Sequence, residues 1–175
     1  DWAMGKPRGD ARSIAARATG IGELKGDHTC FVVADLTEDG RLIVLYCLNE
    51  RIPMGSNAPR LAEVCRRWTP VVVAGDDDNL SETMLLETRR FRDIPLTRPM
   101  AIGGRNKLVR SQAAIVRAER GMIYLPNVSI PLGMGGVAES WVDVLSDQLA
   151  AFSGADGDQD DLCDAMAILG RLADD

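Results

Sequence analysis

The sequence has 175 residues, of which 46% are hydrophobic and 26% charged, with a mean hydropathy of −0.06. This composition is typical of one globular domain and excludes a disordered chain and a collagen. It also excludes a membrane protein, because no apolar run approaches the roughly 20 residues that cross a bilayer. The net charge of −6 argues against a nucleic-acid partner, although acidic and basic residues gather in separate stretches. We expect a single domain over residues 1–175. The missing initiator Met predicts that it was cut from a longer protein.

The content of histidine and cysteine restricts the possible chemistry. His28 is the only histidine, so a zinc site with several His ligands cannot form. No G-x-S-x-G motif accompanies it, which argues against a catalytic triad. The four cysteines are scattered without a C-x-x-C pair: Cys30, Cys47, Cys65 and Cys163. We expect reduced, mostly buried thiols.

The first part of the chain predicts a loop, a hairpin and a helix. Residues 3–26 are rich in Gly, Arg and Ala without a clear period, which predicts a long loop. Two β-rich runs, residues 30–34 and 42–46, flank the turn sequence at 37–40 and predict a β-hairpin. A helix is expected over residues 57–68, with Asn57 as its N-cap.

The middle of the chain predicts a buried strand that ends at an acidic turn. Residues 70–74 form a short continuous apolar run, which is typical of a strand buried on both faces. Gly75 and the aspartates Asp76, Asp77 and Asp78 follow directly. Next we expect a helix over about 81–91 and a short segment at 94–96.

The last part of the chain predicts three helices and a strand. Residues 107–120 have helical spacing and end at Gly121, a typical residue after a helix. A short strand is expected at 122–126, and amphipathic helices at 137–152 and about 160–172. Together these elements predict an α/β layered domain with a mixed sheet.

The last helix carries the most informative acidic residues. On a helical projection Asp161 lies within the apolar arc, Asp164 lies on its flank and Asp160 points away. A carboxylate directed at the core is costly unless it is paired, and a divalent metal would pair with it. The alternative is that Asp160 or Asp161 only caps the helix, which leaves Asp164 unexplained. The arc consists of Leu162, Ala165, Met166, Ile168, Leu169 and Leu172.

A second candidate ligand follows the buried strand. Asp76 would present its carboxylate at the rim of the sheet, although Asp77 or Asp78 could equally do so. Alternatively, this acidic turn caps the following helix.

Several segments, taken in order, resemble the nuclease domain of viral large terminases. Asp1-Trp2-Ala3 and residues 26–29 resemble the D-x-A … G-D-Y-T opening of that family. Residues 106–112 and 119–126 are similar to its D-K-x-x-R-A … G-x-V-x-x-P stretch. The segment from Trp141 to Phe152 and residues 160–165 resemble the W-x-x-x-x-x-E-L-x-x-F … D-D-x-V-D-A ending.

The resemblance implies a ribonuclease H-like fold, a mixed central sheet flanked by helices, with an acidic metal site. The family's three catalytic acids fall on Asp1, Asp76 and Asp161, with Asp160 and Asp164 as neighbouring ligands of two Mg²⁺ or Mn²⁺ ions. Two departures stand out. The second acid of the family is often Glu, and the strand that should precede Asp1 is absent, so either it lies outside this chain or the assignment of Asp1 is wrong.

The implied activity is metal-dependent cleavage of double-stranded DNA during viral genome packaging in the host cytoplasm. Implied partners are the viral portal, the small terminase subunit and an ATPase domain of the same full-length protein, and no membrane. Another ribonuclease H-like nuclease, such as a Holliday-junction resolvase, and a non-catalytic module that docks on the portal are the alternatives. Candidate contacts with DNA phosphates are Lys6, Arg8, Arg105, Lys107 and Arg110.

Overall fold

A β-hairpin forms the centre of the molecule, and the sequence prediction of this hairpin is confirmed. Strand β1 (Thr29–Leu36) pairs antiparallel with β2 (Leu42–Glu50), and the register shifts between Val33 and Ala34. Gly40 has a φ of +82° in the connecting turn, a conformation that favours glycine. The computed structural model describes residues 28–76, 86–95, 97–100, 106–126, 141–154 and 161–174.

Helix α2 (Asn57–Trp68) follows a short 3₁₀ turn, η1 (Met54–Ser56), and has the predicted bounds. Asn57 is nevertheless its first helical residue and not its N-cap, which is Ser56. The buried Asn57 side chain instead accepts a hydrogen bond from Thr29 Oγ1 at 3.1 Å, which ties the start of α2 to the start of β1. Thr69 ends the helix with a left-handed φ of 45°.

The strand expected at residues 70–74 is displaced toward the acidic turn. Strand β3 (Val73–Asp76) pairs in parallel with β4 (Thr97–Met100), which begins just after the short segment expected at 94–96. The prediction of burial on both faces is wrong for Val71, which is 95% exposed and precedes the strand. Of the helix expected over 81–91, residues 86–88 are helical and 81–85 lie outside the described residues.

The last part of the chain forms the predicted elements. Helix α4 (Lys107–Glu119) begins after Asn106, whose side chain accepts from the N–H of Leu108 at 2.9 Å, and ends before Gly121 with φ +64°. Strand β5 (Ile123–Tyr124) then pairs in parallel with β2. Helices α5 (Trp141–Ala151) and α6 (Asp161–Leu172) complete the described chain, and residues 137–140 and 160 of the predicted helices lie outside it.

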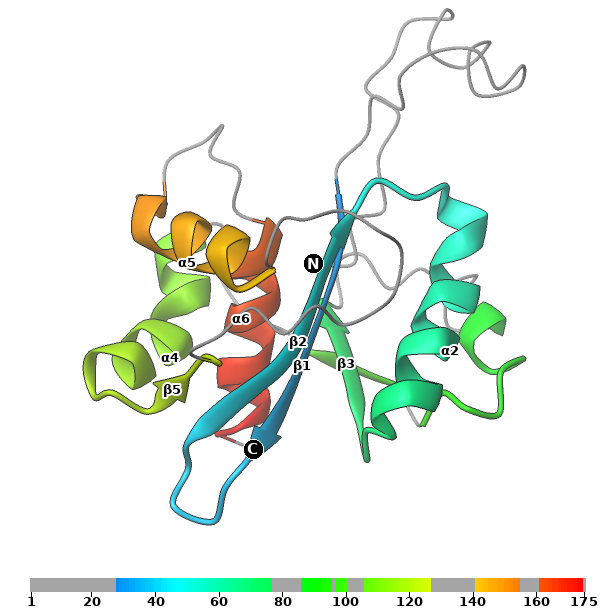
Figure 1. Cartoon of the computed structure of the whole chain (residues 1–175), viewed down its shortest axis with the longest axis horizontal. Coiled ribbons are helices and arrows are strands. Elements are labelled where there is room, and N and C mark those ends of the chain that lie inside the picture. The colour runs from blue at the N-terminus through cyan, green and yellow to red at the C-terminus, as the bar shows by residue number, and fades with distance from the viewer. Residues whose placement is uncertain are drawn as a thin grey trace, which may run out of the picture.

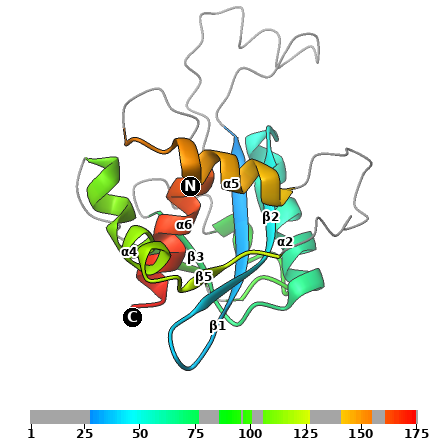
Figure 2. The ribbon, with the colours of Figure 1, turned by 60° about the vertical axis from the view of Figure 1, so that its left-hand side comes forward.

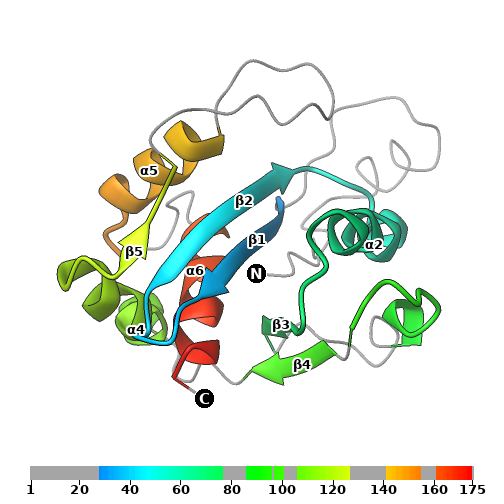
Figure 3. The ribbon, with the colours of Figure 1, turned by 60° about the horizontal axis from the view of Figure 1, so that its bottom comes forward.

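These elements form three layers, which confirms a mixed α/β domain (Figure 1). The strands make a three-stranded mixed sheet in the order β1-β2-β5 and a two-stranded sheet of β3 and β4, which lie beside the hairpin (Figure 3). Helix α2 covers one side, while α4, α5 and α6 cover the other (Figure 2).

Side chains of β1 alternate between two hydrophobic clusters, one on each side of the sheet. Phe31 packs into the cluster with α2, and Cys30 packs into the cluster with α5 and α6. Helix α6 contacts both sheets as well as α4 and α5, so it is the central helix of its layer. Among the described residues, no helix has the length and apolar character needed to cross a bilayer.

Candidate functional site

The first turn of α6 places two predicted metal ligands at one end of the sheet. Asp161 begins the helix and is partly buried, and Asp164 follows one turn later with only 4% of its surface exposed. The side chain of Gln148 on α5 caps this turn, because its Oε1 accepts from the N–H of Leu162 at 3.1 Å. The helix start that carries both carboxylates is therefore fixed by a neighbouring helix.

Asp164 is held by an arginine from α4. Arg110 Nη2 lies 3.3 Å from Asp164 Oδ2, with side-chain exposures of 19% and 6%. Asp164 lies on the flank of the apolar arc, as predicted, but it is buried because α4 packs against α6. The guanidinium partner offsets part of the cost of burying this carboxylate.

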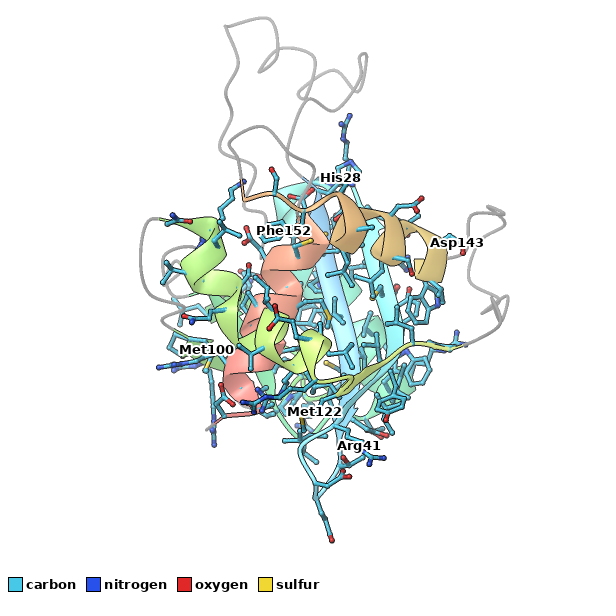
Figure 4. The ribbon with its side chains drawn as sticks, turned by 90° about the vertical axis from the view of Figure 1, so that its left-hand side faces the viewer. His28, Arg41, Met100, Met122, Asp143 and Phe152 are labelled. Atoms are coloured by element: carbon cyan, nitrogen blue, oxygen red, sulfur yellow. The ribbon has the colours of Figure 1, made fainter. Side chains whose placement is uncertain are left out.

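The start of β1 and the end of β2 meet the same end of α6. Asn49 Oδ1 lies 2.6 Å from His28 Nδ1 and accepts from the Cys30 thiol at 3.2 Å. His28 lies at this end of the molecule, and Arg41 and Met122 lie at the opposite end (Figure 4). A polar group on the hairpin thus accompanies the carboxylates of α6.

The Cys30 thiol of β1 has a pKa that is raised in part by these carboxylates. Burial, with smaller contributions from the negative charges of Asp161 and Asp164, raises the pKa of the Cys30 thiol to about 12. A thiol with so high a pKa stays protonated and is a poor nucleophile. All four cysteines are buried free thiols. Cys30 therefore contributes an uncharged side chain beside the carboxylates of α6.

The strand that carries Asp76 packs against the helix that carries Asp161. Helix α6 contacts β3, and Asp76 is the last residue of β3, opposite Met100 of β4. Because α2 returns the chain from the end of β2 to the hairpin-turn end, β3 runs back toward the end at which α6 begins (Figure 1). The side chains of Asp76, Asp77 and Asp78 lie outside the described part of the chain, as do all of Asp1 and Asp160.

The described residues hold part of the predicted acid cluster. Within them, no three His, Cys, Asp or Glu side chains gather in a group that could hold a metal ion. Asp161 and Asp164 supply two carboxylates on one helical turn, which are the hard oxygen ligands that Mg²⁺ and Mn²⁺ prefer. A complete site would need at least one further carboxylate, and the other predicted ligands are the candidates for it.

A basic groove runs along α4 and α6. Lys107 and Arg110 lie on the first turn of α4, while Lys6, Arg8 and Arg105 lie outside the described residues. The groove has a volume of about 400 Å³ and is lined by Arg110 together with residues that the sequence analysis did not single out: Arg117, Arg120 and Arg171. A signal for Arg117 was present in the sequence, because positions 110 and 117 share one face of a helix.

Two parallel ion pairs bridge these helices. Arg117 Nη1 lies 2.8 Å from Asp174 Oδ1, and its Nη2 donates to the carbonyl of Ala173 at 3.1 Å. With the Arg110–Asp164 pair at the other end, α4 and α6 run in the same direction. The groove therefore extends from Arg110, the partner of Asp164, along α4 to Arg171 and Asp174 at the end of the described chain.

Comparisons with known proteins give no match to a protein-family model, a curated protein or a solved structure. What the chain does must therefore be inferred from its own residues and their positions.

Proposed function

We propose that this chain is a ribonuclease H-like, metal-dependent endonuclease domain that cleaves double-stranded DNA, the nuclease part of a viral large terminase. The observation that carries the proposal is the pair of carboxylates on the first turn of α6, which lie at the end of the sheet toward which β3 and Asp76 run. The ordered sequence motifs that resemble the terminase nuclease support the same function.

The acidic residues divide into catalytic ligands and neighbouring ligands. Asp1, Asp76 and Asp161 are the proposed catalytic ligands, with Asp160 beside them. Asp164 is the other neighbouring ligand, and its pair with Arg110 fixes its carboxylate on the first turn of α6. Two Mg²⁺ or Mn²⁺ ions held there would supply an activated water and stabilise the leaving oxygen of the phosphodiester.

The basic groove would guide the DNA backbone to these acids. Lys107 lies at the start of α4, next to the turn that faces Asp164. Arg120 and Arg171 are exposed at the far end of the groove. Contacts with phosphates do not depend on the DNA sequence, which suits a nuclease that cuts with little choice of sequence. They weaken as the salt concentration rises. They also give a protein with a net charge of −6 a local surface that can bind a polyanion.

The remaining assignments depend on this function. The domain would act beside an ATPase domain of the same full-length protein, with the viral portal and the small terminase subunit as partners, in the cytoplasm of the host cell. A portal-docking module without activity would share these partners but would not cleave DNA in the presence of a metal.

The test is cleavage of supercoiled plasmid with Mn²⁺, comparing Asp161→Asn with the matched control Asp143→Asn. Asp143 is exposed in the first turn of α5, so Asp143→Asn removes the same charge as Asp161→Asn at a position outside the candidate site. We expect the parent and Asp143→Asn to nick the plasmid and Asp161→Asn to lose at least about 100-fold in rate, as for removal of an electrostatic element of a catalytic site. Equal rates for all three would contradict the assignment.

The substrate separates a terminase from a resolvase. A packaging nuclease should cut linear duplex with little choice of sequence, whereas a resolvase should prefer a four-way junction. Faster cleavage of the junction than of a linear duplex of equal length would favour the resolvase.

A further inference from the structure

The far end of the basic groove contains an arginine that is bound by an acidic residue of the same chain. Arg117 of α4 pairs with Asp174, which follows α6, with Nη1 and Oδ1 2.8 Å apart. The Arg117 side chain is 13% exposed and that of Asp174 is 46% exposed. Arg117 Nη2 also donates to the Ala173 carbonyl, so the arginine is fixed in the wall of the groove. Its acidic partner lies at the surface, where another anion can replace it.

The charges around this ion pair are mostly positive. Within the described part of the chain, Asp174 is the one acidic residue that lines the groove, and the basic residues of the lining are Arg110, Arg117, Arg120 and Arg171. Arg120 and Arg171 are exposed, and neither forms an ion pair with a described residue. The Asp174 carboxylate therefore occupies a position at which the surrounding arginines would attract an external anion.

The length of the arginine row matches the backbone of duplex DNA. Arg110 and Arg120 are ten residues apart along α4 and its C-cap, which corresponds to about 15 Å at 1.5 Å per residue. One strand of B-DNA carries a phosphate about every 3.4 Å along the helix axis, so about four phosphates span this length. An acidic peptide is the alternative occupant, but it lacks the regular charge spacing that a rigid row of arginines can match.

We propose that Asp174 competes with a DNA phosphate for Arg117, so that the acidic residue after α6 limits the affinity of the groove for duplex DNA. The inference rests on the proposed function and adds a regulatory residue to it. In the free protein Arg117 is paired with Asp174. In the complex a phosphate oxygen takes the place of the Asp174 carboxylate, which turns to solvent. Arg117 remains paired in both states, so the exchange does not leave a charge buried without a partner.

The test measures binding of a short fluorescent DNA duplex by anisotropy in EDTA, so that metal-dependent cleavage cannot occur. Asp174→Asn removes the competing charge. Its matched control is Asp93→Asn, because Asp93 pairs with Arg66 at 3.2 Å, has a 43% exposed side chain and does not line the groove. Both variants change the net charge equally.

Only the variant in the groove should bind DNA more tightly than the parent. Asp174→Asn should gain about five- to tenfold in affinity at about 0.1 M salt, the effect of one further phosphate contact. The slope of log K against log salt should become steeper by about 0.9 for the same reason. Asp93→Asn should match the parent in both respects. An equal gain for the two variants, or no gain for Asp174→Asn, would overturn the proposal.

Arg117→Gln tests whether Asp174 acts through this arginine. The substitution should cancel the gain of Asp174→Asn and its added slope, and it should weaken binding less in the parent, where a phosphate contact is offset by the lost contact with Asp174. Arg171→Gln changes an exposed residue of the groove and keeps the test decisive if Arg117→Gln does not fold. It should reduce the slope by about 0.9 in both backgrounds, and an unchanged slope would contradict binding in the groove.

Two further outcomes separate this proposal from its alternatives. Tighter binding of poly-glutamate than of the duplex would overturn it, because the occupant would then be an acidic peptide. A protein that binds as expected but does not cut plasmid with Mn²⁺ would contradict the nuclease function and not the competition. Cleavage of plasmid without any effect of Asp174→Asn on binding would contradict the competition alone.

Discussion

Helices α2 and α6 have the same length of twelve residues but occupy different environments. Six residues of α2 are buried, and three are exposed: Pro59, Arg66 and Arg67. Eight residues of α6 are buried, because two sheets and two helices surround it. An ordinary amphipathic helix therefore covers one face of the domain, and a nearly enclosed helix carries the candidate site.

The polar residues of the two helices differ in the same way. On α2, Arg60 pairs with Glu63 at 2.6 Å, and 43% of the Glu63 side chain is exposed. On α6, Asp164 is buried and reaches Arg110 on another helix. Water can solvate an exposed charge that has lost its partner, but it cannot reach a buried charge. The ion pair on α6 should therefore contribute more to stability than the pair on α2.

Removal of the acidic partner from each pair should show the largest difference between the helices. Asp164→Ala should lower the free energy of unfolding by about 3 kcal/mol, because Arg110 loses the carboxylate that offsets its burial. Glu63→Ala should cost less than about 1 kcal/mol, as is usual for a partly exposed ion pair. Urea unfolding followed by circular dichroism measures both.

The double variant Arg110→Met/Asp164→Leu is the control for this first prediction. It removes both charges and should regain much of the stability that Asp164→Ala loses. Similar losses for Asp164→Ala and Glu63→Ala would mean that the enclosure of α6 does not govern the strength of its ion pair.

The next largest effect should come from the closest approach of α6 to its neighbour. A Cβ atom on Gly170 would lie 2.7 Å from the backbone N of Ala114 and 3.1 Å from the carbonyl carbon of Ala113. Backbone atoms of α4 cannot move aside cheaply, so Gly170→Ala should cost about 1–3 kcal/mol despite the better helix propensity of alanine.

Gly55, in the turn before α2, is the matched position for this second prediction. Among the described residues, nothing lies within 4 Å of a Cβ built there, so Gly55→Ala should change stability by less than about 1 kcal/mol. The two variants are compared by the urea midpoint at constant slope. A loss at Gly55 as large as that at Gly170 would contradict tight α4–α6 packing as the cause.

Local sequence patterns were sufficient to predict most helices and the hairpin. The bounds of α2 follow from its periodicity and from Pro59 in its first turn, and Gly121 marks the end of α4. Strand pairing was less accessible, because it depends on residues distant in the sequence. Thr97–Met100 contains Pro99 and has no strand pattern, yet it pairs with Val73–Asp76.

The candidate site was predicted only in part for a similar reason. A helical projection shows which side of one helix is apolar, but not which other helices pack against it. It therefore predicts that Asp161, and not Asp164, points toward the core. The structure buries Asp164 more deeply because α4 covers the flank of α6, and the partner Arg110 is 54 residues away in the sequence. Two further contacts have no local sequence signature either. Gln148 of α5 caps the first turn of α6, and Asn49 of β2 accepts a hydrogen bond from the Cys30 thiol.

The smallest predicted effect concerns the thiols on the two sides of the sheet. Burial raises the pKa of Cys65 on α2 from 9.0 to about 11, and burial together with the carboxylates of α6 raises that of Cys30 to about 12. The unfolded chain then loses these protons at a lower pH than the folded chain, so each thiol contributes stability that is complete below pH 9 and is lost as the pH rises through the folded pKa.

Cysteine-to-alanine variants isolate this contribution, because the other groups that titrate at high pH are common to all chains. Relative to the parent, Cys65→Ala should show a shallower fall in unfolding free energy between pH 9 and about pH 11, and Cys30→Ala a shallower fall that continues to about pH 12. Urea unfolding at intervals of half a pH unit measures the difference. The same pH dependence of the unfolding free energy for Cys30→Ala and the parent would contradict the raised pKa of the Cys30 thiol. It would then also contradict the burial of Cys30 beside the carboxylates of α6.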